Sequence, residues 1–150
     1  MLAKDIMTKE VVTAGKDTPV VEAIDMLLKN RITGMPVVDA EGNLVGIVSE
    51  ADLIYKEESI LPLSAYWMDK ADFLKACRKA VATCVEEAMT SKVYSVSEEV
   101  PVEEIATMMI EKGIKRVPVV RGRKVVGIIS RADVMKAIVA EWPEALHPSW

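Results

Sequence analysis

Two short strings place a serine three residues before an aspartate, and both have the chemistry to hold part of a nucleotide. They are Ser49-Glu-Ala-Asp52 and Ser130-Arg-Ala-Asp133, and each follows an apolar run. If a helix begins at the serine, its free N–H groups and the hydroxyl suit an anion such as phosphate. A carboxylate one turn later can accept two hydrogen bonds from the vicinal hydroxyls of a ribose. The same spacing also makes a capping box, in which serine and aspartate satisfy the first helical turn. Both interpretations stay open, and they are compatible because a capping serine can still face a cleft.

A pair of adjacent cations, Lys115 and Arg116, precedes an apolar run in the second half of the chain. Arginine can hold a phosphate through two parallel hydrogen bonds, so this pair indicates a phosphate contact. The corresponding place in the first half has the neutral residues Thr33 and Gly34. The alternative is a solvated corner between a helix and a strand, where exposed cations contribute little.

The two serine–aspartate strings belong to an internal repeat. Residues 7–38 match residues 89–120 at 11 of 32 aligned positions, and residues 44–54 match residues 125–135 at 6 of 11. Proline, glycine, serine and aspartate recur in register, which chance similarity between helices would not produce. We therefore predict two copies of one unit, at 1–55 and 85–138. An insert at 56–84 separates them, and a tail at 139–150 follows.

Each copy has the pattern of a β-α-β-β-α unit. Extended segments are predicted at 10–14 and 92–96, where the hydroxyl of Thr13 or Ser95 could orient a backbone that reads a base edge. After a helix, two apolar runs joined by turn residues predict a β-hairpin, and a second helix begins at the serine of each string. A unit of this size is marginal alone, so packing of the two copies with pseudo-twofold symmetry is the expected way to bury both sheets. The expected fold class is α/β (α+β).

The first helix of each copy is predicted to begin at a proline, because the N–H that proline lacks is not used in the first turn. These prolines are Pro19 and Pro101, and Thr18 could cap the first helix. Helical spacing predicts one apolar face on each helix. The predicted faces are Ala23, Ile24, Leu27 and Leu28 in the first copy and Ile105, Met108, Met109 and Ile110 in the second.

Composition argues against several functions. The net charge of −4 gives no reason to expect a nucleic-acid partner. Two cysteines and one histidine cannot complete a usual zinc site, and no nucleophilic triad, P-loop string or dinucleotide-binding string is present, so we expect no enzyme. The longest run without a charged residue, 59–68, is far shorter than the roughly 20 apolar residues of a membrane span. With charges near the start and no secretion signal, the expected location is cytoplasmic, without a membrane partner.

The insert predicts an added helix that starts near Asp69. The apolar face predicted for this helix consists of Phe73, Leu74, Cys77 and Val81. We expect that Tyr66 and Trp67, ahead of it, cover the end of the core, with a dimer contact or a lid over a cleft as alternatives. His147 in the tail has no neighbours in the sequence that suggest a metal or a base, so it is expected on the surface.

Taken together and in this order, these motifs resemble the cystathionine-β-synthase (CBS) domain family, present as a tandem pair over about 4–55 and 85–138. The motifs are Asp5-Ile-Met-Thr, Glu87-Ala-Met-Thr, Thr18-Pro-Val-Val-Glu-Ala, Gly34-Met-Pro-Val-Val-Asp, Arg116-Val-Pro-Val-Val and the two Gly-Ile-hydrophobic-Ser-x-Ala-Asp strings.

The resemblance implies a regulatory module, often called a Bateman module, that is a homodimer and acts on an effector protein in trans. It implies adenosine-containing ligands, namely AMP, ADP, ATP or S-adenosylmethionine, bound as regulatory ligands in clefts between the repeats, with no tightly bound cofactor. By this likeness the aspartates hold ribose hydroxyls and the serines approach phosphate. The cation pair faces the phosphates of the ligand in the same cleft or, as an alternative, in the opposite cleft. The adenine is framed by backbone at 13–14, 35–36, 95–96 and 117–118. The implied ligand-binding residues are Thr13, Ala14, Gly34, Met35, Pro36, Ser49, Asp52, Ser95, Val96, Lys115, Arg116, Val117, Pro118, Ser130 and Asp133. The alternative is a structural dimerisation module whose clefts are degenerate.

Overall fold

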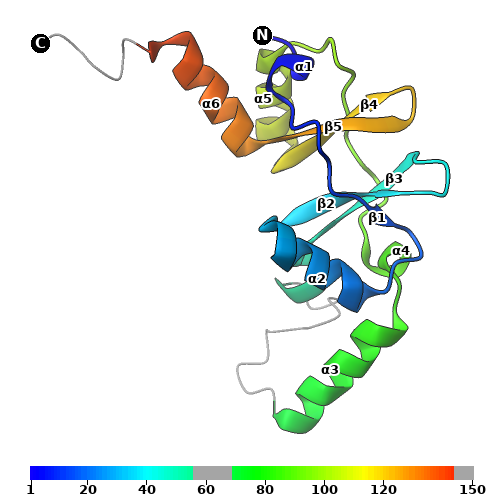
Figure 1. Cartoon of the computed structure of the whole chain (residues 1–150). Helices are drawn as coiled ribbons and strands as arrows, with labels where there is room; N and C mark the ends of the chain where they lie inside the picture. The colour runs from blue at the N-terminus through cyan, green and yellow to red at the C-terminus, as the bar shows by residue number, and fades with distance from the viewer. Residues whose placement is uncertain (56–68, 144–150) are drawn as a thin grey trace, which may run out of the picture. The chain divides into compact units, whose positions relative to one another are not determined.

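The structure, a computed structural model, describes residues 1–55 and 69–143. The chain divides into two compact units, one formed by Val12–Val93 and the other by Met1–Val11 together with the chain from Tyr94 onward. Each unit combines helices with a small β-sheet, so the expected α/β class is confirmed (Figure 1).

The unit that contains the first repeat is built on a three-stranded sheet with the order β1-β2-β3. Strand β1 is parallel to β2, and β2 and β3 form the predicted antiparallel hairpin. Its elements are β1 (Ala14–Gly15), α2 (Val20–Asn30), β2 (Gly34–Val38), β3 (Leu44–Ser49), the π-helix η1 (Ala51–Tyr55), α3 (Lys70–Ala82) and α4 (Val85–Ala88).

The other unit repeats this plan with a shorter sheet. Its hairpin pairs β4 with β5, and Val96 adds one parallel bridge to Val119 where the first repeat has β1. Its elements are α1 (Ala3–Ile6), α5 (Val102–Lys112), β4 (Arg116–Arg121), β5 (Lys124–Ser130) and α6 (Arg131–Glu141).

Helices α2 and α5 begin where the prolines predicted, but two details differ. Thr18 does not cap α2, because its Oγ1 accepts a hydrogen bond from the Gly15 N–H at 3.1 Å. The outermost predicted core positions were also wrong: Leu28 is 72% and Ile110 83% exposed. The buried face of each helix instead includes the residue that follows the proline. The buried positions are Val20, Ala23 and Leu27 in α2 and Val102, Ile105 and Met109 in α5.

The N-terminal segment of each repeat, 1–11 in the first and 85–93 in the second, packs with the other repeat and is called its exchanged segment. Thr8 and Ile128 exchange two backbone hydrogen bonds of 2.9 and 3.0 Å, and Thr90 and Ile47 exchange two of 2.8 and 2.9 Å. The fully buried members of the two segments are Ala3 in α1 and Val85 in α4. Each compact unit therefore needs a segment that the order of the sequence assigns to the neighbouring repeat.

A glycine in the middle of β3 and of β5 makes room for the methionine of the exchanged segment. A Cβ on Gly127 would lie 2.8 Å from Cγ and 3.0 Å from Cβ of Met7. A Cβ on Gly46 would lie 3.0 Å from Cγ of Met89. All three distances are shorter than van der Waals contact, so only glycine fits at these two strand positions without a shift.

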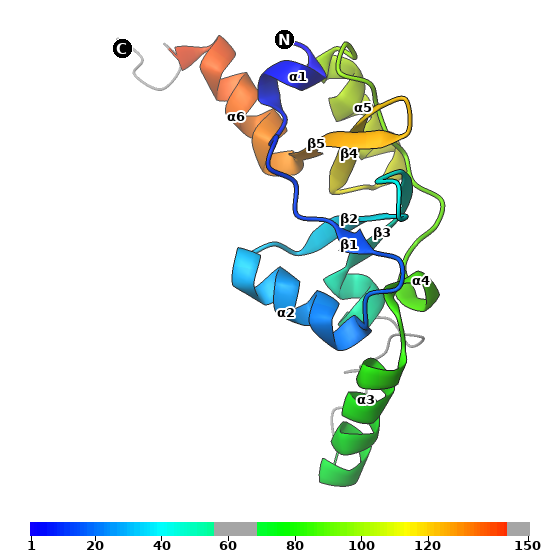
Figure 2. The ribbon, with the colours of Figure 1, turned by 45° about the vertical axis from the view of Figure 1, so that its right-hand side comes forward.

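Helix α3 forms as predicted, but its predicted buried face was wrong. Phe73 is 52%, Leu74 43% and Val81 63% exposed, whereas Ala76 and Ala80 are buried. Figure 2 shows α3 projecting beyond the sheet of its own unit. The buried face of α3 therefore consists of small alanine side chains. The element with which α3 makes most of its contacts is α2.

The two cysteines lie on different elements, and both are half-buried free thiols. Cys77 is in α3, and Cys84 immediately precedes α4. The expectations for Tyr66, Trp67 and His147 concern positions outside the described residues.

Candidate functional site

In the second repeat, the serine–aspartate string forms a complete capping box at the start of α6. Asp133 Oδ2 accepts hydrogen bonds from the Ser130 N–H at 2.8 Å and from the Ser130 hydroxyl at 3.0 Å. The Ser130 hydroxyl in turn accepts from the Asp133 N–H at 3.3 Å. These bonds fix the carboxylate at a helix N-terminus, and both side chains are only half-buried. Among the described residues, no donor contacts Asp133 Oδ1, so one oxygen is available for a ligand.

In the first repeat, the two bonds that the aspartate accepts from its serine recur, but the helix predicted to begin at Ser49 is the π-helix η1 rather than an α-helix. Asp52 Oδ2 accepts from the Ser49 N–H at 2.9 Å and from the Ser49 hydroxyl at 3.2 Å. Asp52 Oδ1 accepts from the Thr90 hydroxyl at 3.3 Å. Thr90 comes from the exchanged segment, and nothing in its local sequence signals this contact.

The predicted glycine–proline and arginine–proline segments lie directly across the hairpins from the two serines. Gly34 pairs with Ser49 in β2–β3, and Arg116 pairs with Ser130 in β4–β5. The residues that follow in β2 and β4 are fully buried, so their side chains belong to the two cores and only their backbones border this region. These residues are Met35, Pro36, Val117 and Pro118.

The predicted first-strand residues lie on the other side of β2 and β4. Ala14 pairs with Val37 and is 1% exposed. The Val96 N–H donates to the Pro118 carbonyl at 3.0 Å, and the Val96 carbonyl accepts at 2.8 Å. Since the Val96 N–H is already used in the sheet, it is not a donor for a base edge. The half-buried Thr13 and the exposed Ser95, one residue earlier, keep hydroxyls that a ligand can reach.

The corner before each hairpin also differs in charge between the repeats. In the second repeat, the Arg131 N–H donates to the Lys115 carbonyl at 3.1 Å, so Arg131 lies beside the predicted cation pair. The same bond in the first repeat, at 2.9 Å, joins the Glu50 N–H to the Thr33 carbonyl. Sequence reasoning missed Glu50 and Arg131, although the alignment of the repeats sets them opposite each other.

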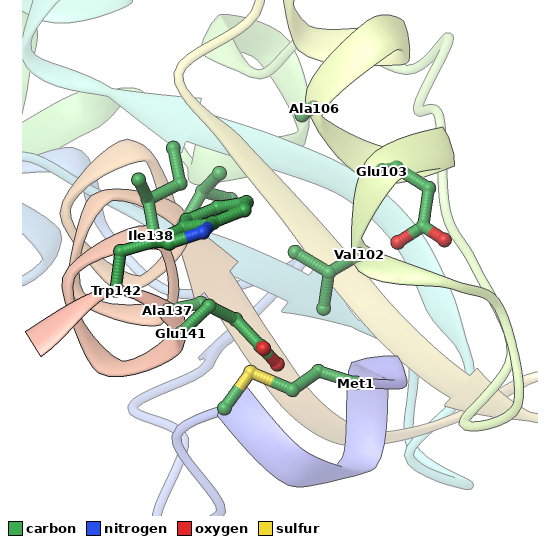
Figure 3. Close-up of a pocket in the computed structure, with 9 residues that line it drawn as sticks. Met1, Val102, Glu103, Ala106, Ala137, Ile138, Glu141 and Trp142 are labelled. Carbon is green, nitrogen blue, oxygen red and sulfur yellow. The ribbon is translucent and has the colours of Figure 1, made fainter.

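A groove of about 500 Å³ lies on the second-repeat unit, between α5 and α6 and next to Met1 (Figure 3). Its lining is mostly apolar and includes Val102, Ile138 and Trp142, with Glu103 and Glu141 as carboxylates. None of the predicted ligand-binding residues lines it. This groove is therefore separate from the serine–aspartate site.

Within residues 1–55 and 69–143, no three His, Cys, Asp or Glu side chains gather closely enough to hold a metal ion. The helices of the same ranges include none with the length and apolar character needed to cross a bilayer.

Comparison with known proteins settles the family. The model of the CBS domain matches residues 3–58 and 85–140. The chain belongs to the CBS domain family. The expected tandem pair is thereby confirmed.

Relatives of this CBS pair include proteins of nearly the same length. It is 32% identical to the uncharacterized protein MJ1426 of Methanocaldococcus jannaschii, over 93% of this chain and 92% of that protein. It spans only 56% and 23% of the next two curated relatives, so the activities of those longer proteins are not transferred to it.

Solved CBS pairs share the fold. CBSX2 from Arabidopsis thaliana superposes with a TM-score of 0.79 at 28% identity, over 95% of this chain and 96% of that one. A structure of CBSX2 in complex with AMP gives a TM-score of 0.72 at 28% identity, over 93% and 97% of the two chains. The CBS pair of protein MJ0100, in complex with 5'-methylthioadenosine and S-adenosyl-L-methionine, gives 0.71 at 31% identity, over 94% and 98%.

Proposed function

We propose that this CBS pair is a regulatory module that binds adenosine-containing ligands and modulates a partner protein in trans. One observation carries the proposal: the serine–aspartate arrangement occurs twice with matching geometry, in a chain whose solved relatives were crystallised with AMP, 5'-methylthioadenosine and S-adenosyl-L-methionine.

The capping boxes suit this role because they orient the acid before a ligand arrives. Oδ2 of each aspartate accepts from its own serine, and at Asp133 this leaves Oδ1 for a vicinal diol such as that of ribose, whereas Asp52 Oδ1 accepts from the Thr90 hydroxyl. Backbone beside Thr13 and Ser95 would frame the base. We retain as predictions the position of the ligand between the repeats and the role of the cation pair at the phosphates. The ligand is proposed as an exchangeable regulator, and the proposal includes no catalytic step and a cytoplasmic location.

A structural dimerisation module is the second candidate, and two observations favour it. The capping boxes stabilise their helices without any ligand. Helix α6 also exposes several large apolar side chains that a second copy could cover. They are Met135, Ile138, Val139 and Trp142.

Thermal unfolding with added ligands separates the two candidates. AMP, ADP, ATP, NAD and S-adenosylmethionine are each added to the full chain, and a ligand at 100 times its dissociation constant should add about 2.7 kcal/mol of stability. At least one adenosine compound is expected to raise the unfolding midpoint. No shift with any of them would leave the dimerisation module as the better account.

The variant Asp133→Asn makes the test specific to the site. Asparagine keeps an oxygen that can accept from the Ser130 N–H, so the start of α6 is preserved while the charge and one ribose acceptor are lost. We expect the midpoint without ligand to fall by no more than a few degrees and most of the ligand-induced shift from this site to vanish. An unchanged shift in both Asp133→Asn and Asp52→Asn would remove the aspartates from the site.

A further inference from the structure

The two serine–aspartate sites carry opposite charge at one equivalent position. Glu50 follows Ser49, and Arg131 follows Ser130. The Glu50 N–H donates to the Thr33 carbonyl, and the Arg131 N–H donates to the Lys115 carbonyl. Thr33 and Lys115 are the residues immediately before β2 and β4. Glu50 and Arg131 therefore occupy the same corner of their repeats, and their side chains are the feature that differs.

The corner of the second repeat gathers positive charge. Arg131 Nε donates to the Ile114 carbonyl at 3.3 Å, which holds its guanidinium against the segment that contains Lys115 and Arg116. The positions equivalent to Lys115 and Arg116 hold the neutral Thr33 and Gly34 in the first repeat, where Arg31 two residues before Thr33 is a cation and Glu50 adds a negative charge. A phosphate next to the first corner meets a carboxylate, whereas a phosphate next to the second meets guanidinium and ammonium groups.

We infer that the two sites accept different classes of adenosine compound, an inference that rests on the proposed function. The Ser130–Asp133 site takes phosphorylated adenosine. The Ser49–Asp52 site takes adenosine compounds without a phosphate, including those with a cationic group on the 5' carbon. Arg131 and Glu50 are the residues that set this preference.

The contact between Thr90 and Asp52 supports a second difference. A ribose diol needs Asp52 Oδ1, which the Thr90 hydroxyl occupies at 3.3 Å. The backbone of Thr90 is fixed by its two bonds to Ile47, so the hydroxyl leaves only by rotation of its side chain. The equivalent residue Thr8 makes no such contact to Asp133 within the described part of the chain. We propose that Thr90 competes with the ligand at the first site.

Single-site variants measured by isothermal titration calorimetry test the ligand classes. In full-length Asp52→Asn only the second site remains, and AMP and ATP are expected to bind at least about tenfold more tightly than adenosine, as charge-assisted hydrogen bonds to phosphate imply. In Asp133→Asn only the first site remains, and S-adenosylmethionine or adenosine is expected to bind more tightly than AMP. Adding salt should weaken AMP binding to the second site only.

Charge variants then identify the residues responsible. Arg131→Gln in the Asp52→Asn background should weaken AMP by about tenfold and leave adenosine unchanged, while the control Arg123→Gln, which removes an exposed cation in the β4–β5 turn, should alter neither. Glu50→Arg in the Asp133→Asn background should strengthen AMP binding. Two results would overturn the inference but leave the proposed function standing. One is the same order of ligand affinities in both single-site variants. The other is a loss of AMP affinity in Arg123→Gln equal to that in Arg131→Gln. Absence of binding by the unmodified protein would instead refute the proposed function.

Thr90→Val tests the competition separately. Loss of the long hydrogen bond from the Thr90 hydroxyl to the Asp52 carboxylate should raise affinity at the first site by about two- to tenfold. The matched variant Thr8→Val should leave affinity at the second site unchanged. No gain from Thr90→Val in a chain that binds ligand at the first site would refute the role of Thr90.

Discussion

Replacement of Gly127 by alanine tests the packing of the exchanged segment, on which the second-repeat unit depends. The added Cβ would lie 2.8 Å from Cγ and 3.0 Å from Cβ of Met7, so the segment must shift or the methionine must change rotamer. Overpacking of this kind costs about 1–3 kcal/mol. The gain in strand propensity when alanine replaces glycine, about 0.5–1 kcal/mol, offsets only part of this. We expect net destabilisation, with a loss of about 2–4 °C in Tm for each kcal/mol in a chain of this size.

The assay is a double-mutant cycle measured by chemical and thermal unfolding. Met7→Ala removes the Cγ and Sδ atoms that the new Cβ would meet, so Gly127→Ala should cost less in that background, with a coupling energy of about 0.5–3 kcal/mol. Gly15→Ala is the control, because its Cβ would meet only Thr18 Oγ1 at an ordinary 3.5 Å. Equal costs of Gly127→Ala with and without Met7 would refute the packing argument. The pair Gly46 and Met89 gives an independent repetition of the cycle.

Three further outcomes are expected. Arg31, which follows α2, has a φ of 53° in the left-handed region, and the equivalent residue after α5 is Gly113 with a φ of 62°, so Arg31→Gly should stabilise the chain by about 0.5–1 kcal/mol in urea unfolding, and a loss of stability would contradict this. The hydrogen bond from Arg121 lowers the pKa of the Glu98 carboxyl, so the pair stabilises the fold at neutral pH and ceases to do so as the pH falls through that lowered pKa. Arg121→Gln should raise this pKa in an NMR titration of Glu98, and an unchanged midpoint would exclude the pairing. Sedimentation at micromolar concentration should give a dimer, and a particle of 16.5 kDa would refute the homodimer.

Local patterns in the sequence predicted both hairpins, the helices after the prolines, the capping box at the start of α6 and the bonds between Ser49 and Asp52. These features depend on residues a few positions apart. The pairing of Ser130 with Asp133, for example, needs only the first turn of one helix. Because the sequence repeats, the same local interactions were predicted for both serine–aspartate sites.

The arrangement of partners distant in the sequence required the tertiary structure. The periodicity of α2 marks an apolar stripe but does not say where its centre lies, so Leu28 was assigned to the core although it is exposed. The apolar face of α3 was misjudged for the same reason: its alanines pack and Phe73 does not. The hydrogen bond from Thr90 to Asp52 joins residues 38 positions apart.

The sequence by itself determined that this protein has two equivalent serine–aspartate sites, since strand alternation, helix capping and turns are governed by neighbours along the chain. Only the tertiary structure decided that each compact unit includes the N-terminal segment of the other repeat, that Thr90 from such a segment contacts Asp52, and that Glu50 and Arg131 occupy matching corners. The physical reason is that many apolar segments satisfy the same hydrophobic pattern, whereas the choice among them depends on shape, such as the space that Gly46 and Gly127 leave for a methionine.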